Sequence, residues 1–278
     1  MRKTGAVLTG LVTAAILLVA GPGRTGDKDS RWKKFLPADA YKELVEREVK
    51  ILKASLQGKV EEEAINRAKL AAVMIAALAL SAEKDVKQSA VVEHAALQLA
   101  KLLQEKDKIP QAQKIADALA AMKLVSPAGG LQAVNMKKIF GGEVLAMMDH
   151  LRTKMKGGDG IHEALQTNIR LKGALNGIEE KIRSLESKKL GNAAMSKSAA
   201  EMVLLGYRTA VLAEITYDFA PAKEEGKKTP KLWRNFSVQM RDASLDMAAA
   251  AKKNDADAVH RAATRLYATC NNCHSVFK

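Results

Sequence analysis

The stretch Cys270-Asn271-Asn272-Cys273-His274-Ser275-Val276-Phe277-Lys278 brings two thiols and an imidazole together within five residues. Residues three and four positions apart lie on one face of a helix. The preceding stretch, from Val259 onward, has apolar residues at helical spacing, and Asn254-Asp255 is typical of a helix N-cap. We therefore predict that Cys270, Cys273 and His274 share one face of a long amphipathic helix.

The C-x-x-C-H pattern is typical of covalent c-type haem attachment. Each thiol can add to one vinyl group of the porphyrin, and the imidazole of His274 can bind the iron as the proximal ligand. A thioredoxin-type pair expects a strand-helix context, and a structural zinc site needs four ligands. The chain has two cysteines, and its other histidines show no ligand spacing. A disulfide between Cys270 and Cys273 stays open, but we expect one covalent haem c.

The composition favours an all-α protein. Of 278 residues, 47% are hydrophobic and only 4% aromatic, and the chain is rich in alanine and leucine. Such a chain forms helices that pack closely through small side chains. Its length suggests two compact units.

Residues 1–20 are predicted to be a signal peptide. Arg2 and Lys3 precede an uncharged apolar run from Ala6 to Ala20, which is shorter than the ~20 residues of a membrane span. Export would place the chain in the periplasm or otherwise outside the cytoplasm, where c-type haem is attached in bacteria. Residues 21–36 then read as a flexible lead-in, and cleavage of the signal stays open.

Residues 37–123 are predicted to form a haem-free antiparallel bundle of four helices joined by short connections. The run from Leu70 to Leu80 is apolar on every side, which predicts deep burial between neighbouring helices. The expected helices cover 38–58, 60–83, 86–106 and 110–122.

A Gly-rich junction with short helices is predicted over residues 124–160, before a second bundle over residues 161–278. Thr229-Pro230 is typical of an N-cap followed by the first position of a helix. The expected helices of this unit cover 161–188, 193–219, 230–253 and 255–278.

This second unit resembles the cytochrome c prime family, which carries C-x-x-C-H on the last of four helices. The resemblance is clear over residues 229–278 and extends by pattern back to residue 161, so that it covers under half of the chain. It rests on Trp233-Arg234-Asn235-Phe236, on Asn254-Asp255-Ala256-Asp257-Ala258, and on the terminal pattern C-x-x-C-H-x-x-[FY]-[RK]. It implies that the second unit is a four-helix haem domain. Together with the first bundle, the chain is then expected to be two antiparallel helical bundles in tandem.

The resemblance also implies the surroundings of the haem. Phe277 and Leu266 would line it, and Lys278 would be the basic residue beside the proximal face. Residues 168–175 contain no methionine, so Leu171 or Leu175 would face the iron and leave a guarded site for a small gas such as nitric oxide. If a junction helix takes the role of the first helix, a methionine could bind the iron instead: Met136, Met147, Met148 or Met155.

We expect electron transfer and/or small-gas binding rather than catalysis, because the sequence lacks a Ser-His-Asp set, a phosphate loop and a second metal cluster. A haem enzyme of the peroxidase or nitric oxide reductase type stays open, with His162 and Glu163 as its distal acid-base candidates. A protein whose first bundle docks a redox partner is a further alternative.

The net charge of +14 restricts the classes of partner that we expect. The cations are scattered among acids along helices, which argues against nucleic acid and favours a set of solvated helix faces. Attraction to an acidic redox partner or to an anionic membrane surface is the functional alternative. A homodimer is also compatible with the sequence.

Overall fold

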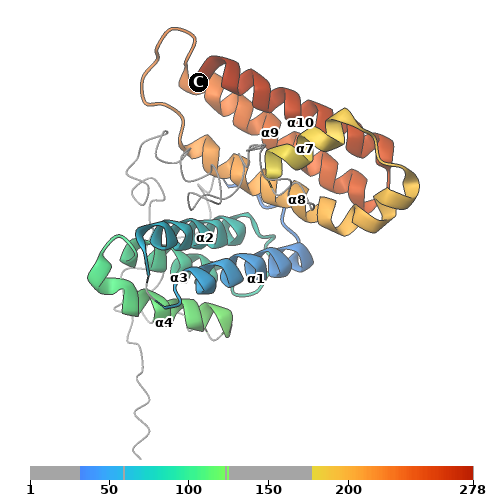
Figure 1. The fold of residues 1–278 in the computed structure, drawn as a ribbon. Coiled ribbons are helices and arrows are strands. Elements are labelled where there is room, and N and C mark those ends of the chain that lie inside the picture. The colour runs from blue at the N-terminus through green and yellow to red at the C-terminus, as the bar shows by residue number, and fades with distance from the viewer. Residues whose placement is uncertain (1–31, 59, 123, 125–176, 278) are drawn as a thin grey trace, which may run out of the picture.

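A computed structural model describes residues 32–58, 60–122, 124 and 177–277 (Figure 1). In these ranges the chain is all-α, with no β-strand, as the composition predicts. The described helices are α1 (Ala38–Ser55), α2 (Glu62–Ser81), α3 (Ser89–Leu102), the 3₁₀ helix η1 (Lys106–Lys108), α4 (Ile109–Ala120), α7 (Ile178–Ser187), α8 (Asn192–Asp218), α9 (Pro230–Lys252) and α10 (Ala256–Phe277).

Helices α1 to α4 pack on one another, with α1 against α2 and α4, and α3 against α2 and α4 (Figure 1). Every residue of α2 from Leu70 to Ser81 is buried, which confirms the predicted burial of its apolar run. Helix α3 begins three residues later than the predicted start at residue 86, because Gln88 adopts a left-handed φ of 65°.

Helices α7 to α10 form the second set of contacts, in which α9 lies between α8 and α10, and α7 packs on α10. Both predicted N-caps are confirmed. The Thr229 hydroxyl accepts a hydrogen bond from the Leu232 amide at 3.1 Å, and the Asp255 carboxylate accepts one from the Ala258 amide at 2.9 Å. These caps fix where α9 and α10 begin.

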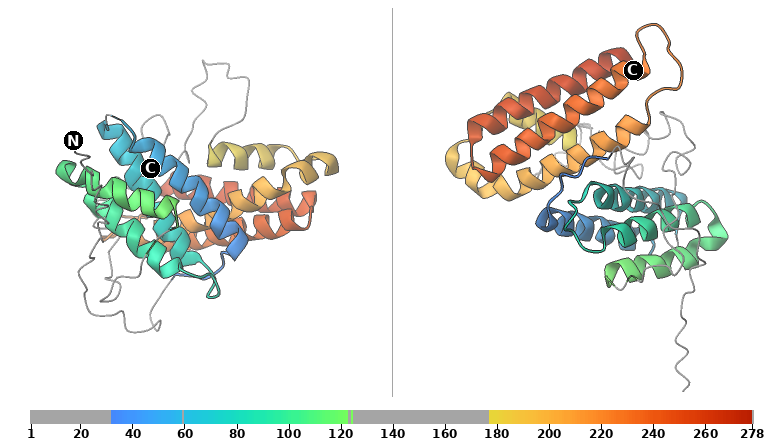
Figure 2. Two further views of the ribbon diagram at one scale, coloured as in Figure 1. Left: turned by 90° about the horizontal axis from the view of Figure 1, so that it is seen from below. Right: turned by 180° about the vertical axis from the view of Figure 1, so that it is seen from behind.

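Helix α8 packs on α1 and α2 as well as on α9 (Figure 2). Its residues from Thr209 to Ile215 are all buried, because neighbouring helices cover it on more than one side. Two ion pairs cross the contact with α1. Arg208 lies 2.9 Å from the buried Glu48, and Arg47 lies 2.7 Å from the exposed Glu201.

One described helix, α2, is long and apolar enough to cross a membrane, and 78% of its most apolar window is buried inside the molecule. Several predictions fall outside the described residues: the signal peptide, most of the lead-in, nearly all of the Gly-rich junction, and the first part of the helix predicted over 161–188. The same holds for Leu171, Leu175, Lys278, His162, Glu163 and the four candidate methionines.

Candidate functional site

The candidate site occupies the end of α10. The buried residues of this helix recur at helical spacing and stop at Thr269: Ala256, Val259, Ala262, Ala263, Leu266 and Thr269. The same stripe continues into Cys270, Cys273, His274 and Phe277, which are only half-buried. The inward face of one helix thus changes from small apolar side chains to two thiols and an imidazole.

Helix α7 runs antiparallel to α10 and begins near the level of Cys270. Nδ1 of His260, close to the start of α10, lies 2.9 Å from the Leu185 carbonyl oxygen, close to the end of α7. Glu179, in the first turn of α7, acts electrostatically on the thiol of Cys270. In the described part of the chain, α7 therefore accompanies α10 only as far as the first cysteine, and this explains why the burial of the stripe decreases there.

Helix α9 holds the last turn of α10 through an aromatic cluster of Trp233, Phe236 and Phe277. The ring of Phe277 meets that of Trp233 edge-on, with 5.0 Å between centroids, and that of Phe236 at 6.5 Å. The indole Nε1 of Trp233 donates a hydrogen bond to the Thr216 carbonyl oxygen at 2.7 Å. Trp233 is buried, so its ring is part of the hydrophobic core.

Both thiols are free, and their raised pKa values keep them protonated at neutral pH. Burial raises the pKa of Cys270 to about 12, and the charges of Glu179 and Cys273 add to the effect. Burial also raises the pKa of Cys273 to about 11. A redox-active thiol pair needs the opposite shift, which a helix N-terminus or a neighbouring cation provides. These cysteines lie at the C-terminal end of a helix, where the helix dipole disfavours a thiolate.

The geometry also differs from a site that holds a single metal ion. Among the described residues, no group of three or more His, Cys, Asp or Glu side chains is placed to bind a metal ion. Cys270, Cys273 and His274 instead extend along one helix face. Each can reach a different atom of one large flat group, and this is what two vinyl groups and an iron require. The residues present therefore fit a covalently attached haem.

Of the other predicted pocket residues, Leu266 lies one turn before Cys270 and is completely buried. Phe277 lies one turn after Cys273, in the aromatic cluster. The sequence did not indicate the approach of Glu179 to Cys270, because it depends on the register between α7 and α10. The ring contacts of Phe277 had a partial signal, since Trp233 and Phe236 are three residues apart on a predicted helix.

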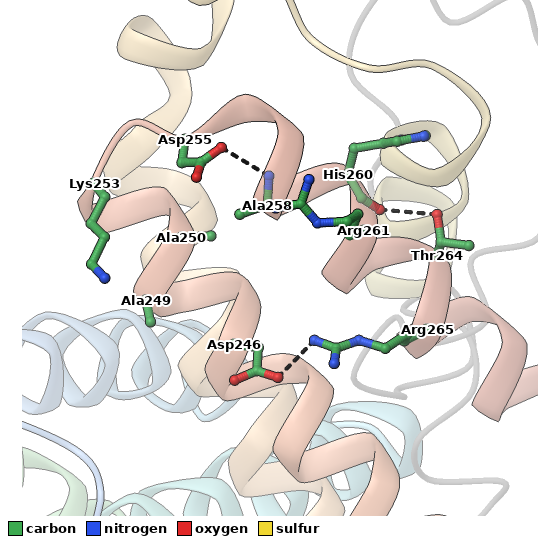
Figure 3. A pocket seen from close by; sticks show the side chains of 10 residues that line it. All are labelled: Asp246, Ala249, Ala250, Lys253, Asp255, Ala258, His260, Arg261, Thr264 and Arg265. Atoms are coloured by element: carbon green, nitrogen blue, oxygen red, sulfur yellow. Dashed lines mark hydrogen bonds and ion pairs between the residues drawn. The ribbon is translucent and has the colours of Figure 1, made fainter.

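An open groove with a volume of about 630 Å³ lies along α9 and α10 toward the turn that joins them (Figure 3). Its charged side chains include Asp246, Lys253, Asp255, Arg261 and Arg265. Arg265 pairs with Asp246 at 2.6 Å, and Asp255 caps α10, so these groups have structural partners. No sequence motif predicts chemistry here.

Comparison of the chain with protein-family models, with curated proteins and with solved structures found no match.

Proposed function

We propose that this protein is an exported c-type haem protein that transfers electrons and/or binds a small neutral gas such as nitric oxide. One observation carries the proposal. The inward stripe of α10 changes to Cys270, Cys273 and His274 near the level where α7 begins. Beside such a helix face, a flat apolar group can extend the hydrophobic core into the space that side chains would otherwise fill.

Each residue has a distinct role in this proposal. The thiols of Cys270 and Cys273 become thioethers, and His274 is the proximal iron ligand. Leu266 and Phe277 line the group, and the contact of Phe277 with Trp233 holds the last turn of α10 in place. When bound, haem would supply one-electron exchange and an axial position for a gas. The roles of Leu171, Leu175 and Lys278 continue to rest on the family resemblance.

The proposed fold assignment follows the same reasoning. Helices α1–α4 and α7–α10 would be two antiparallel bundles in tandem. The second would be a four-helix bundle like that of cytochrome c prime. The packing of α9 between α8 and α10, and of α7 on α10, supports this assignment.

The test is covalent haem content after maturation in a bacterial host that exports and attaches c-type haem. Purified chain is unfolded, extracted with acidic acetone and assayed as the pyridine haemochrome. Wild type should retain one haem per chain, and Cys270→Ala/Cys273→Ala should retain none. The matched control is His260→Ala, which removes the other histidine of α10 and should leave the haem content unchanged. Absence of covalent haem from wild type, or equal content in the cysteine variant, contradicts the proposal.

Absorption spectra then identify what opposes His274. A leucine-capped site predicts a five-coordinate, high-spin ferric spectrum and a new ferrous band when nitric oxide is added. A low-spin spectrum with a methionine-to-iron band would instead indicate a methionine ligand, and would leave electron transfer as the function.

A further inference from the structure

A cluster of cations lies next to the candidate site, in the segment that joins α8 to α9 and begins α9. Residues 221–234, named here the basic loop, carry five cations and two carboxylates. The cations are Lys223, Lys227, Lys228, Lys231 and Arg234, and the carboxylates are Glu224 and Glu225. The loop is therefore strongly positive over a short length.

The basic loop has a defined backbone. The amide of Lys228 donates to the Glu225 carbonyl at 2.9 Å, and the amide of Glu225 donates to the Lys228 carbonyl at 3.2 Å. Gly226 makes this tight turn with a left-handed φ of 57°, which glycine adopts without strain. The side chains of Lys227 and Lys231 are exposed and make no ion pair with any other described residue. Their charges are therefore available to a partner.

The basic loop lies beside the end of α10 that carries Cys273 and His274. Trp233, inside the loop segment, meets Phe277 at 5.0 Å, and the neighbouring Arg234 lies over the Tyr217 ring at 5.7 Å. In Figures 1 and 2 the loop between α8 and α9 lies next to the C-terminal end of α10 in each view that shows both. A partner bound to the loop would thus contact the molecule at its proposed haem edge.

The opposite end of α9 differs in charge. The groove in Figure 3 has three Lys or Arg side chains and two Asp side chains, and one of each is paired through Arg265 and Asp246. Helix α9 has 23 residues, so its two ends lie roughly 33 Å apart at 1.5 Å per residue. That distance is several times the screening length of about 8 Å at physiological salt. A partner at one end is therefore almost insensitive to charges at the other.

The composition of the basic loop distinguishes a protein partner from a lipid surface. The large apolar side chains of the basic loop are Leu232, which is half-buried, and Trp233, which is buried, whereas peripheral membrane segments insert exposed side chains of this kind between lipids. Cations on a polar loop instead suit electrostatic docking of a carboxylate-rich protein face.

We infer that the basic loop is the docking surface for an acidic protein that exchanges electrons at the α10 site. The inference rests on the proposed function. Its redox step moves one electron between the ferrous haem and the partner's oxidised centre, so that the haem becomes ferric, the partner is reduced by one electron, and no atom is transferred.

Direct binding tests the docking surface without depending on haem. Fluorescein-labelled poly-L-glutamate is titrated with the mature protein at low salt, and the dissociation constant is measured by fluorescence anisotropy. Lys227→Glu/Lys231→Glu is compared with Lys253→Glu/Arg261→Glu, which changes the net charge equally at the far end of α9. The loop variant should bind about tenfold more weakly than wild type, and the far-end variant less than about twofold. The difference should disappear at about 0.5 M salt.

Equal weakening in the two variants would mean that only net charge matters, and would overturn the inference. A second arm uses vesicles of phosphatidylcholine with phosphatidylserine. Loop-dependent binding to the vesicles, without loop-dependent binding to poly-L-glutamate, would assign the loop to a membrane and also overturn it. Circular dichroism of each variant confirms that the fold is intact.

Stopped-flow oxidation of the ferrous protein by hexacyanoferrate(III) connects the loop to the site. One electron passes to the oxidant, which becomes hexacyanoferrate(II), and the loop variant should react several-fold more slowly than the far-end variant. Loop-dependent binding in a protein that carries no haem would contradict the proposed function and leave the docking surface standing. Haem with equal oxidation rates in the two variants would contradict only the link between the loop and the site.

Discussion

Helices α2 and α10 have similar lengths and opposite surroundings. Of the 20 residues of α2, 14 are buried, because α1, α3 and α8 pack around it. Of the 22 residues of α10, six are buried, because only α7 and α9 pack on it among the described helices. A helix enclosed on all sides has no face left for a ligand. A helix with one inward stripe can instead carry ligand-binding side chains in part of that stripe.

The difference explains where chemistry is found in this chain. In the enclosed part of α2 a change of side chain alters only packing, and Leu70–Leu80 accordingly consists of Ala, Leu, Val, Ile and Met alone. In α10 the stripe is apolar as far as Leu266 and then carries Cys270, Cys273 and His274. The burial pattern therefore separates a helix that holds the molecule together from one that presents a site.

The largest expected effect comes from a charge placed inside α2. Leu78 is completely buried, so Leu78→Asp would bury a carboxylate with no partner, at a cost of more than about 4 kcal/mol, and the chain should fail to fold. Ala268→Asp, on the exposed face of α10, should cost less than about 1 kcal/mol. Urea unfolding followed by circular dichroism measures both. A tolerated Leu78→Asp would contradict the enclosed position of α2.

The next effect concerns the contact between α1 and α8. Glu48 is buried and pairs with Arg208 at 2.9 Å, and the Arg208 side chain is 19% exposed. Glu48→Gln should destabilise the fold by about 2–3 kcal/mol, because the guanidinium loses its counter-charge. Glu48→Met/Arg208→Met removes both charges and should restore most of that stability. If Glu48→Gln unfolds at the wild-type urea concentration, the pair does not connect the two sets of helices.

The features that were predicted correctly depend on residues that are close together in the sequence. Thr229 and Asp255 cap their helices as predicted, because a cap depends on a few adjacent residues. The burial of Leu70–Leu80 followed from its composition alone. The position of Cys270, Cys273 and His274 on one helix face followed from spacing.

Pairings between distant segments could not be predicted in the same way. Nothing near Glu48 or Arg208 indicates that residues 160 positions apart form a pair across two helices. The register of α7 on α10 likewise depends on packing along the whole length of both helices, so the approach of Glu179 to Cys270 had no local signal. The pattern of hydrophobic residues also assigns charged residues to the surface, and Glu48 and Glu214 are both buried.

A smaller effect tests the close contact between α8 and α9, which positions the aromatic cluster. A Cβ atom at Gly206 would lie 2.7 Å from the Ser244 carbonyl oxygen and 2.9 Å from Cβ of Ala248. Gly206→Ala should therefore force the helices apart and cost about 1–3 kcal/mol, even though alanine favours helix. Gly191→Ala, at the N-cap of the same helix, meets no atom within 4 Å and should cost less than about 1 kcal/mol, the preference of an N-cap for glycine over alanine. Equal urea midpoints for the two variants would mean that α8 and α9 are not closely packed.

The smallest effect is the pH dependence of the exposed pair between Arg47 and Glu201. The hydrogen bond from Arg47 lowers the pKa of the Glu201 carboxyl below its ordinary value of 4.5. A lowered pKa means that the pair adds stability above the unfolded-state pKa, and that this contribution is lost as the pH falls through the lower folded-state value. Because the Glu201 side chain is 60% exposed, solvent screening limits the contribution to under about 1 kcal/mol.

The stability difference between wild type and Glu201→Gln measures this contribution by urea unfolding. It should be constant from pH 7 to about pH 5.5 and shrink as the pH falls below the unfolded-state pKa and through the lower folded-state one, and added salt should reduce it. Glu46→Gln is the matched control, because Glu46 is exposed on α1 and forms no ion pair with another described residue. A difference that grows as the pH falls would mean that Glu201 does not favour the charged form in the folded protein. Of the two ion pairs between α1 and α8, only that of Glu48 with Arg208 would then stabilise the fold.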